Sequence, residues 1–217
     1  MRKNILLIGL GRFGRYTAMK LKELNQQVMA VDRNEEQVEK VLPYVTYGQI
    51  GDGTNEEFLR TLGVPDYDVC IVAIGDSFIA SLETTSLLKE LGAKKVISRA
   101  TGKSQEKFLL RNGADEVIFP EKQLAVWTAI RCSSSLISNY IDLSSGYAIY
   151  EVDVPDEWVS QSILSLGIRR RFGLNILGIR RDGEMVINAS PDTVLKKTDH
   201  VLVLGKDEDV RKHLHLR

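Results

Sequence analysis

A glycine-rich turn lies near the N-terminus, between an apolar run and a helical pattern. The run Ile5–Ile8 is continuously apolar, as expected of a parallel strand that is covered on both faces. Gly9, Gly11 and Gly14 follow it in the spacing GxGxxG, and Arg15–Leu24 then shows helical spacing of apolar residues. Such glycines permit a tight turn, close approach of the backbone to a phosphate, and close packing of the helix on the strand. The turn therefore predicts a Rossmann-type nucleotide site.

Strand and helix patterns alternate through residues 1–120, which predicts an α/β domain with a doubly wound parallel sheet. The later strands are expected at Val28–Val31, Tyr44–Tyr47, Val69–Ile74, Val96–Ser98 and Val117–Phe119. The later helices are expected at Glu35–Leu42, Asn55–Leu62, Ile79–Leu91 and Gln105–Asn112. Thr54 is a candidate N-cap for the helix that follows it, with Glu57 completing a capping-box pattern.

After Pro120 the pattern changes to one long helix and a small α+β domain. The helix is expected over Lys122–Tyr140, where apolar residues follow helical spacing. Strands are expected at Tyr147–Val154, at Leu174–Ile179 and Met185–Asn188 around an Arg181-Asp182-Gly183 turn, and at His200–Leu204 before a charged terminal helix. With the boundary near 141–146, we expect a nucleotide-binding domain over 1–120, a connecting helix over 121–141 and a C-terminal domain over 142–217.

Composition limits the classes of partner and the compartment. The formal net charge is zero, with 29 basic and 29 acidic side chains, which gives no reason to expect nucleic acid as a partner. Cys70 and Cys132 lack the spacing of a metal site or a CxxC motif, so a reducing, cytoplasmic setting is expected. No uninterrupted apolar run approaches the roughly 18 residues of a membrane span. Any role at a membrane must therefore come through a partner.

Charged residues at the ends of the expected strands favour a polyphosphate ligand. Asp32 follows Gly14 by 18 residues, close to the spacing of a carboxylate that holds ribose hydroxyls. Arg12 lies inside the glycine turn, and Arg99 ends a central strand at the edge where ligands bind. Two arginines at one edge suit a polyphosphate better than a single pyrophosphate, although each alone is equally well explained as a solvated charge.

Several further residues are expected to form the walls of the crevice, among them Gly75, Asp76 and Ser77 at the end of the fourth strand. Asp52 and Thr54 follow the third strand, where they could face an adenine amino group. The alternative is a helix cap, which is the favoured interpretation for Thr54. Arg33 is a residue type that favours NADP, but the neighbouring Asp32 would repel a 2′-phosphate. The expected nucleotide site comprises Gly9, Gly11, Arg12, Phe13, Gly14, Asp32, Arg33, Asp52, Thr54, Ile74, Gly75, Ser77, Arg99 and Glu121.

The sequence contains few candidate catalytic residues for an enzyme of this fold. A dehydrogenase needs an acid or base near the nicotinamide, but His200, His213 and His215 all fall within the last 18 residues. No Tyr-xxx-Lys pair or cysteine nucleophile stands out either. We therefore expect no enzymatic activity, while a small NAD-dependent oxidoreductase and a free-standing NAD(H) redox sensor remain as alternatives.

Together these motifs resemble the RCK family, and within it the cytosolic KtrA/TrkA-type regulatory subunits of bacterial potassium uptake systems. The residues that carry the resemblance are Gly9–Gly14, Ala30–Asp32, Val72–Gly75, Pro120–Lys122 and Tyr140–Leu143. It covers essentially the whole chain, as an RCK N-terminal domain, a crossover helix and an RCK C-terminal (TrkA-C) domain.

The resemblance implies a gating subunit that senses ATP and ADP. Homodimers joined through the crossover helix would assemble into an octameric ring on the inner face of the cell membrane, beneath a membrane-embedded potassium-translocating subunit. Within each crevice, the resemblance places Arg12 on the phosphates, Asp32 on the ribose, Asp52 on the adenine and Arg99 on the terminal phosphates. The two nucleotides would favour different ring shapes and so control potassium flux.

The resemblance implies two further sites. Glu121 matches a position implicated in binding Mg²⁺ or another cation near the nucleotide, although a carboxylate at a helix start is an equal alternative. Ile168, Arg169, Asn175 and Pro191 match positions that bind cyclic di-AMP at a dimer interface in some relatives. The alternative for Arg169–Arg171 is a solvated basic run.

Overall fold

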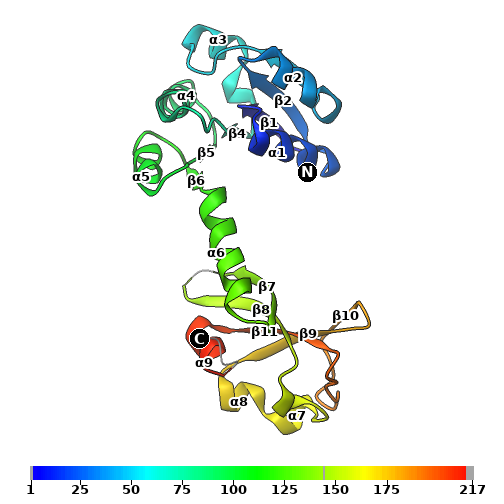
Figure 1. Cartoon of the computed structure of the whole chain (residues 1–217). Coiled ribbons are helices and arrows are strands. Elements are labelled where there is room, and N and C mark those ends of the chain that lie inside the picture. The colour runs from blue at the N-terminus through cyan, green and yellow to red at the C-terminus, as the bar shows by residue number, and fades with distance from the viewer. Residues whose placement is uncertain (1, 144, 214–217) are drawn as a thin grey trace. The chain divides into compact units, whose positions relative to one another are not determined.

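In the described part of the chain, six parallel strands form the sheet of the N-terminal half. The structure is a computed structural model that describes residues 2–143 and 145–213, and it divides into two compact units, 1–121 and 122–217 (Figure 1). The first unit's strands are β1 (Asn4–Ile8), β2 (Gln27–Asp32), β3 (Tyr47–Ile50), β4 (Val69–Val72), β5 (Val96–Arg99) and β6 (Glu116–Ile118). They lie in the order β3-β2-β1-β4-β5-β6. The order reverses between β1 and β4, where sheets of this kind form a crevice.

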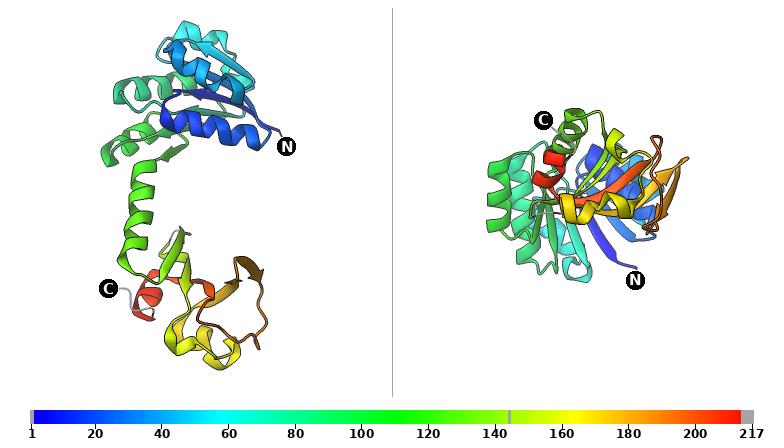
Figure 2. Two further views of the ribbon diagram at one scale, coloured as in Figure 1. Left: turned by 45° about the vertical axis from the view of Figure 1, so that its right-hand side comes forward. Right: turned by 90° about the horizontal axis from the view of Figure 1, so that it is seen from below.

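Helices cover both faces of this sheet (Figure 2). They are α1 (Arg12–Glu23), α2 (Glu35–Val41), α3 (Glu56–Thr61), α4 (Phe78–Glu90) and α5 (Lys103–Arg111). Ile5 and Leu7 of β1 pack in a core cluster with residues of α1 and α2. Leu6 and Ile8 pack in a second cluster with residues of α3 and α4. Because alternate side chains reach opposite cores, β1 reads as a continuous apolar run, and the expected α/β fold is confirmed.

The third strand begins three residues later than its apolar pattern predicts. Leu42–Tyr44 forms a 3-10 turn that contains Pro43, and β3 runs over Tyr47–Ile50. Proline lacks the amide hydrogen that a strand ladder uses, and its ring fixes φ at a value that suits the turn. The prediction of a strand at Tyr44–Tyr47 is therefore wrong in its boundaries.

The cap of α3 also differs from its prediction. Asn55 is the N-cap, and its side chain accepts a hydrogen bond from the Phe58 amide at 3.0 Å. Thr54 instead donates to Asp52 Oδ1, from its amide at 2.9 Å and from its hydroxyl at 2.8 Å. Thr54 therefore shapes the loop after β3, and the capping-box prediction is wrong.

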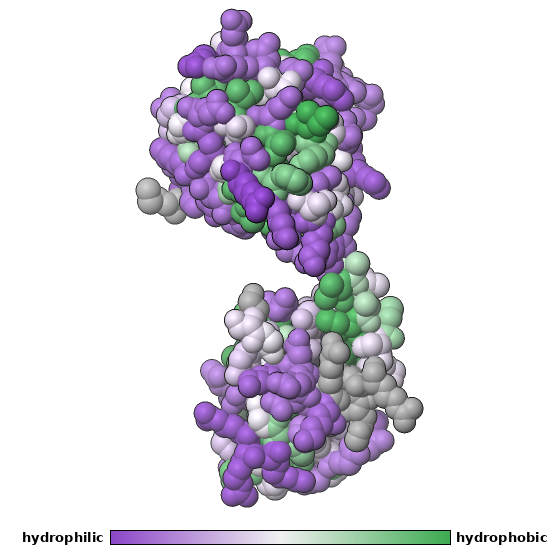
Figure 3. Space-filling view, turned by 90° about the vertical axis from the view of Figure 1, so that its left-hand side faces the viewer, coloured by the Kyte–Doolittle hydropathy of each residue, from purple (hydrophilic) through white to green (hydrophobic). Residues whose placement is uncertain are grey.

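The connecting helix is shorter than its apolar periodicity predicts. α6 runs over Pro120–Ser133, so the expected helix over 122–140 is wrong beyond Ser133. Ser134 Oγ accepts a hydrogen bond from the Leu136 amide at 3.1 Å. Serine side chains compete with the helix ladder through local bonds of this kind. The outward surface of α6 carries exposed apolar residues, among them Leu124 and Val126 (Figure 3).

The helical spacing beyond α6 comes from a β-bulge. β7 (Ile137–Asp142) pairs antiparallel with β8 (Tyr147–Asp153), and the register shifts between Ile137 and Asn139. The irregularity leaves both Ile137 and Tyr140 buried in the core of the second unit. Their spacing of three residues therefore imitates one face of a helix.

The second unit is a small α+β module around an antiparallel sheet in the order β10-β9-β11-β8-β7. Its further elements are β9 (Asn175–Arg181), β10 (Glu184–Ile187), β11 (His200–Lys206), α7 (Ile163–Leu166), α8 (Ile168–Phe172) and α9 (Asp207–His213). The expected hairpin is confirmed, because β9 and β10 pair through a loop in which Asp182 and Gly183 both have positive φ. β7 adds one strand to those expected here.

One buried charge pair ties the loop before β11 to this sheet. Arg181 donates to both carboxylate oxygens of Asp199, at 2.8 and 2.6 Å, and Asp199 is 1 % exposed. The Lys196 amide donates to the same carboxylate at 2.8 Å. The Arg181 hydrogen bonds, opposed by burial, hold the pKa of Asp199 below its ordinary value. The pair therefore stays ionised at neutral pH.

None of the described helices is both long enough and apolar enough to cross a membrane.

Candidate functional site

A cavity of about 520 Å³ opens at the carboxyl ends of β1, β2, β4 and β5. This edge is the crevice that the strand order creates between β1 and β4. The structure brings ten of the fourteen expected site residues to its wall, which are Gly9, Gly11, Arg12, Asp32, Arg33, Asp52, Ile74, Gly75, Ser77 and Arg99. The cavity has the size of a small-molecule site with a few convergent polar groups.

The glycine turn is shaped by close backbone contacts. Gly9 has φ +93°, and a Cβ added to it would lie 2.9 Å from the Ile74 amide nitrogen. A Cβ on Gly14 would lie 2.0 Å from the carbonyl oxygen of Gly9, so α1 packs directly on the turn. A Cβ on Gly11 meets nothing within 4 Å, and Gly11 lines the cavity. Gly9 and Gly14 are thus structural, while Gly11 leaves space in front of the N-terminus of α1.

Asp32 links the glycine turn to the end of β2. Its Oδ2 accepts a hydrogen bond from the Leu10 amide at 2.6 Å, and its Oδ1 accepts one from the Asn34 amide at 2.9 Å. The carboxylate also lines the cavity. Asp32 therefore holds the turn in place and keeps lone pairs that can accept further hydrogen bonds.

Asp52 stands on the same wall after β3. Hydrogen bonds from the Thr54 amide and hydroxyl, with a smaller contribution from the charge of Arg33, lower the pKa of Asp52. Thr54 lies outside the cavity lining and acts on the site through Asp52. An ionised carboxylate here accepts hydrogen bonds and does not donate them.

Arg99 is held from three sides. It forms an ion pair with Glu121, and its Cζ lies 5.7 Å from the centre of the Phe13 ring. A Cβ on Gly75 would lie 2.4 Å from Arg99 Nη1, so the glycine leaves room for the guanidinium. The side chain is 17 % exposed, and its Nε is buried with no hydrogen-bond partner among the described residues. Phe13 and Glu121 thus position Arg99, although neither lines the cavity.

Glu121 is the expected cation ligand, at the start of α6. Burial raises its pKa, but its own backbone amide and the charges of Arg99 and Arg12 outweigh burial and lower it. The described residues contain no cluster of three or more His, Cys, Asp or Glu side chains that could hold a metal. One carboxylate fits Mg²⁺ only where phosphate oxygens and waters supply the other ligands.

Sequence reasoning missed part of the cavity wall. The lining residues outside the prediction are Ile8, Asn34, Gln37, Gly51, Gly53, Ala73 and Ala80. Gly51 and Ala73 directly follow β3 and β4, and that position was the available signal. Asp76, which was expected at the wall with Gly75 and Ser77, pairs with Arg33 Nη2 at 3.2 Å. Ser77 caps α4 by accepting a hydrogen bond from the Ala80 amide at 3.2 Å.

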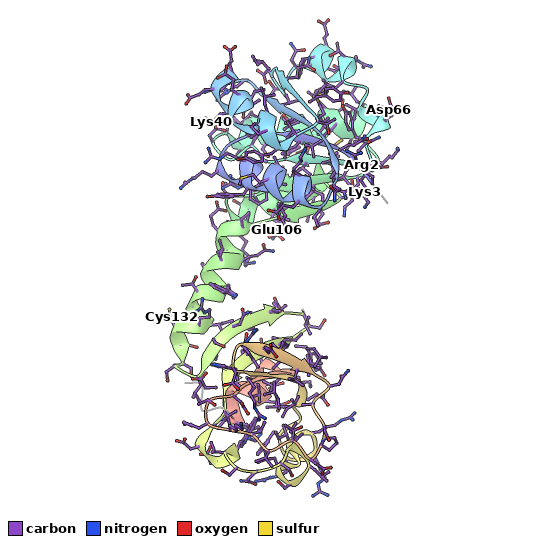
Figure 4. The ribbon with its side chains drawn as sticks, turned by 90° about the vertical axis from the view of Figure 1, so that its right-hand side faces the viewer. Arg2, Lys3, Lys40, Asp66, Glu106 and Cys132 are labelled. Carbon is purple, nitrogen blue, oxygen red and sulfur yellow. The ribbon has the colours of Figure 1, made fainter. Side chains whose placement is uncertain are left out.

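The two cysteines and the described histidines lie outside the cavity lining. Cys70 is buried in β4, and burial raises the pKa of its thiol to about 12. Cys132 is exposed near the end of α6 (Figure 4). His200 and His213 belong to the second unit, and His215 lies outside the described residues.

The four residues expected to hold a second ligand lie around α8 and its neighbouring segments. Ile168 is 3 % exposed and belongs to the core of the second unit. Arg169 is exposed on α8, Asn175 begins β9, and the carbonyl of Pro191 accepts a hydrogen bond from the Leu164 amide at 2.8 Å. The side chain of Ile168 therefore serves packing in this structure, and the second site stays a prediction.

Comparisons with known proteins agree with the two-part architecture. The TrkA-N domain model matches residues 5–120, and the TrkA-C domain model matches residues 147–215. The chain is 36 % identical to the Ktr system potassium uptake protein A of Bacillus subtilis, over 97 % of this chain and 95 % of that protein. It is 34 % identical to the Ktr system potassium uptake protein C of the same organism, over 98 % and 96 %.

A solved structure shares the fold over the whole chain. The GsuK channel bound to NAD superposes with a TM-score of 0.71 at 22 % identity, covering 100 % of this chain and 39 % of the channel chain. At that identity the likeness concerns the fold alone. The sequence relatives match almost end to end, and both domain models match in order. The chain belongs to the family of TrkA-N and TrkA-C domain proteins that includes the Ktr potassium uptake proteins A and C.

Proposed function

We propose that this chain is a nucleotide-sensing regulatory subunit of a potassium uptake system, and that ATP and ADP are its ligands. The observation that carries the proposal is a single cavity lined by the glycine turn, by Arg12 and Arg99, and by the carboxylates Asp32 and Asp52. Arg12 and Arg99 suit the phosphates, while Asp32 and Asp52 suit the ribose hydroxyls and the adenine amino group. The Ktr relatives supply the link to potassium uptake.

NAD(H) is the second candidate ligand, because a channel of the same fold has been solved with NAD. The paired arginines favour a ligand with more phosphate than one pyrophosphate carries. The site offers no acid or base beyond its carboxylates among the lining residues that the structure describes. We therefore propose that the nucleotide acts as a signal that is bound and released unchanged.

The assembly and the remaining ligands are part of the same proposal. Exposed apolar side chains of α6, such as Leu124 and Val126, suit burial between two copies of the chain. Such dimers would build the octameric ring at the cytoplasmic face of the membrane, on a potassium-translocating subunit. Glu121 would hold Mg²⁺ or another cation on the phosphates. Cyclic di-AMP remains a candidate second ligand near Arg169.

Potassium uptake in cells that lack their own uptake systems tests this function. Expression of the chain together with a Ktr-type membrane subunit is expected to raise the uptake rate several-fold over the membrane subunit alone. The variant Gly11→Val, which fills the space in front of α1 without meeting any neighbour within 4 Å at its Cβ, is expected to lose that increase. Equal uptake with and without the chain would contradict the proposal, as would full activity of the variant.

A further inference from the structure

An ion pair spans the cavity between the ends of β2 and β4. Arg33 directly follows β2, Asp76 follows β4, and both residues line the cavity. Arg33 Nη2 lies 3.2 Å from Asp76 Oδ2, and the two side chains are 70 % and 71 % exposed. Because β1 separates β2 from β4 in the sheet, the pair bridges two walls of the crevice.

The charges of the cavity wall are divided between two groups. Arg12 and Arg99 stand at the glycine turn and the end of β5, where the phosphates are proposed to bind. Arg33 instead follows Asp32 in the chain, pairs with Asp76, and acts through its charge on Asp52. The nucleoside end of the cavity is therefore net negative despite its arginine.

Among these carboxylates, Asp76 is the one that engages Arg33 directly. Both oxygens of Asp32 already accept hydrogen bonds from backbone amides, those of Leu10 and Asn34. Oδ1 of Asp52 accepts both hydrogen bonds from Thr54, and Arg33 acts on Asp52 only through its charge. The Arg33 guanidinium donates its hydrogen bond to Asp76.

We propose that Asp76 is a specificity-determining residue, which holds Arg33 across the cavity and so denies it to a phosphate on the nucleotide's 2′-hydroxyl. An arginine close to the carboxylate at the end of the second strand is the group that accommodates a 2′-phosphate in nucleotide sites of this fold. In this chain the arginine is present but paired. The site therefore selects nucleotides whose ribose carries free hydroxyls, and this inference rests on the proposed nucleotide-binding function.

The pair is weak enough for one substitution to change this selection. Exposed ion pairs contribute little to stability, so Asp76→Asn is expected to fold normally and to release the guanidinium. A released Arg33 can form charge-assisted hydrogen bonds with a phosphate. Removing Asp76 also lowers the repulsion of that phosphate, and a second substitution is needed to separate the two effects.

The test compares 5′-AMP with adenosine 2′,5′-bisphosphate, which differ only in the 2′-phosphate. Calorimetric titration of the full-length protein gives a Kd for each, and the wild type is expected to bind 5′-AMP about tenfold more tightly or better. Asp76→Asn is expected to reduce that preference about fivefold. Glu35→Gln removes an equivalent exposed charge at the start of α2, outside the cavity lining, and is expected to leave the preference unchanged.

The double variant Arg33→Gln with Asp76→Asn shows whether the arginine carries the effect. Its preference is expected to differ from that of Arg33→Gln alone by clearly less than fivefold, because no guanidinium remains to be released and only the lost repulsion is left. An unchanged preference in Asp76→Asn would overturn the inference. The inference would also be overturned if Asp76→Asn lowered the preference fivefold both in the wild type and in the Arg33→Gln background. Asp76 would then act only by repelling the 2′-phosphate. A wild type that binds neither 5′-AMP nor ATP would instead contradict the proposed function itself.

Discussion

Gly14→Ala is expected to destabilise the N-terminal unit by about 2–3 kcal/mol, an overpacking cost. The new Cβ would lie 2.0 Å from the carbonyl oxygen of Gly9, which is backbone and has little freedom to move. α1 would have to shift away from the turn, so nucleotide binding is expected to fall as well. Urea unfolding followed by circular dichroism measures the first effect, and calorimetric titration with ATP measures the second.

Gly11→Ala is the matched control for this substitution. Its Cβ meets nothing within 4 Å, and Gly11 has φ −60° as the N-cap of α1, which alanine readily adopts. Stability is therefore expected to stay close to that of the wild type, while the methyl group enters the space where a phosphate would bind. Equal stability of the Gly14→Ala and Gly11→Ala proteins would contradict the assigned roles of the two glycines.

Arg99→Ala is expected to weaken ATP binding about tenfold, in line with the loss of a charge-assisted hydrogen bond. The guanidinium is mostly buried, is positioned by Phe13 and Glu121, and faces the cavity. If Arg99 contacts the terminal phosphates, the loss should be larger for ATP than for ADP and smallest for AMP. Titration of the three nucleotides into wild type and variant gives this series directly.

Arg111→Ala removes the same charge from the exposed end of α5, outside the cavity lining, and serves as the control. Its effect on ATP binding is expected to be small, because exposed charges are screened by salt. A similar loss for Arg99→Ala and Arg111→Ala would show that only net charge matters. A loss that is equal for ATP, ADP and AMP would place Arg99 away from the terminal phosphates.

The Rossmann-type unit could be predicted because its signals are local. The apolar run of β1 and the glycine spacing fix a strand, a turn and a helix, and Asp32 marks the end of β2. Since parallel strands place their carboxyl ends at one edge, residues such as Gly75 and Arg99 could be assigned to the cavity without knowledge of distant contacts.

Two errors arose where a local pattern has two structural solutions. Ile137 and Tyr140 are spaced as on a helix, but a β-bulge achieves the same burial within β7. Thr54 fits a cap, but the neighbouring Asn55 takes that role while Thr54 bonds to Asp52. In both cases the structure adopted depends on contacts with other residues, which the local sequence pattern does not show.

The side-chain pairs within the site could not be predicted from the sequence. The contacts of Arg99 with Glu121 and of Arg33 with Asp76 join residues 22 and 43 positions apart. Their side-chain directions depend on the sheet order and on gaps such as the one beside Gly75. Most residues of the cavity wall could therefore be predicted, but the ion-pair partners of Arg33 and Arg99 could not.

The crevice is expected to bind adenine nucleotides with several phosphates, and a titration measures this binding. Calorimetry of the purified full-length chain with ATP, ADP and NADH gives three dissociation constants under one set of salt and Mg²⁺ conditions. Because Arg12 and Arg99 both line the cavity, ATP is expected to bind more tightly than NADH, which carries one phosphate fewer. Tighter binding of NADH than of ATP would contradict this expectation.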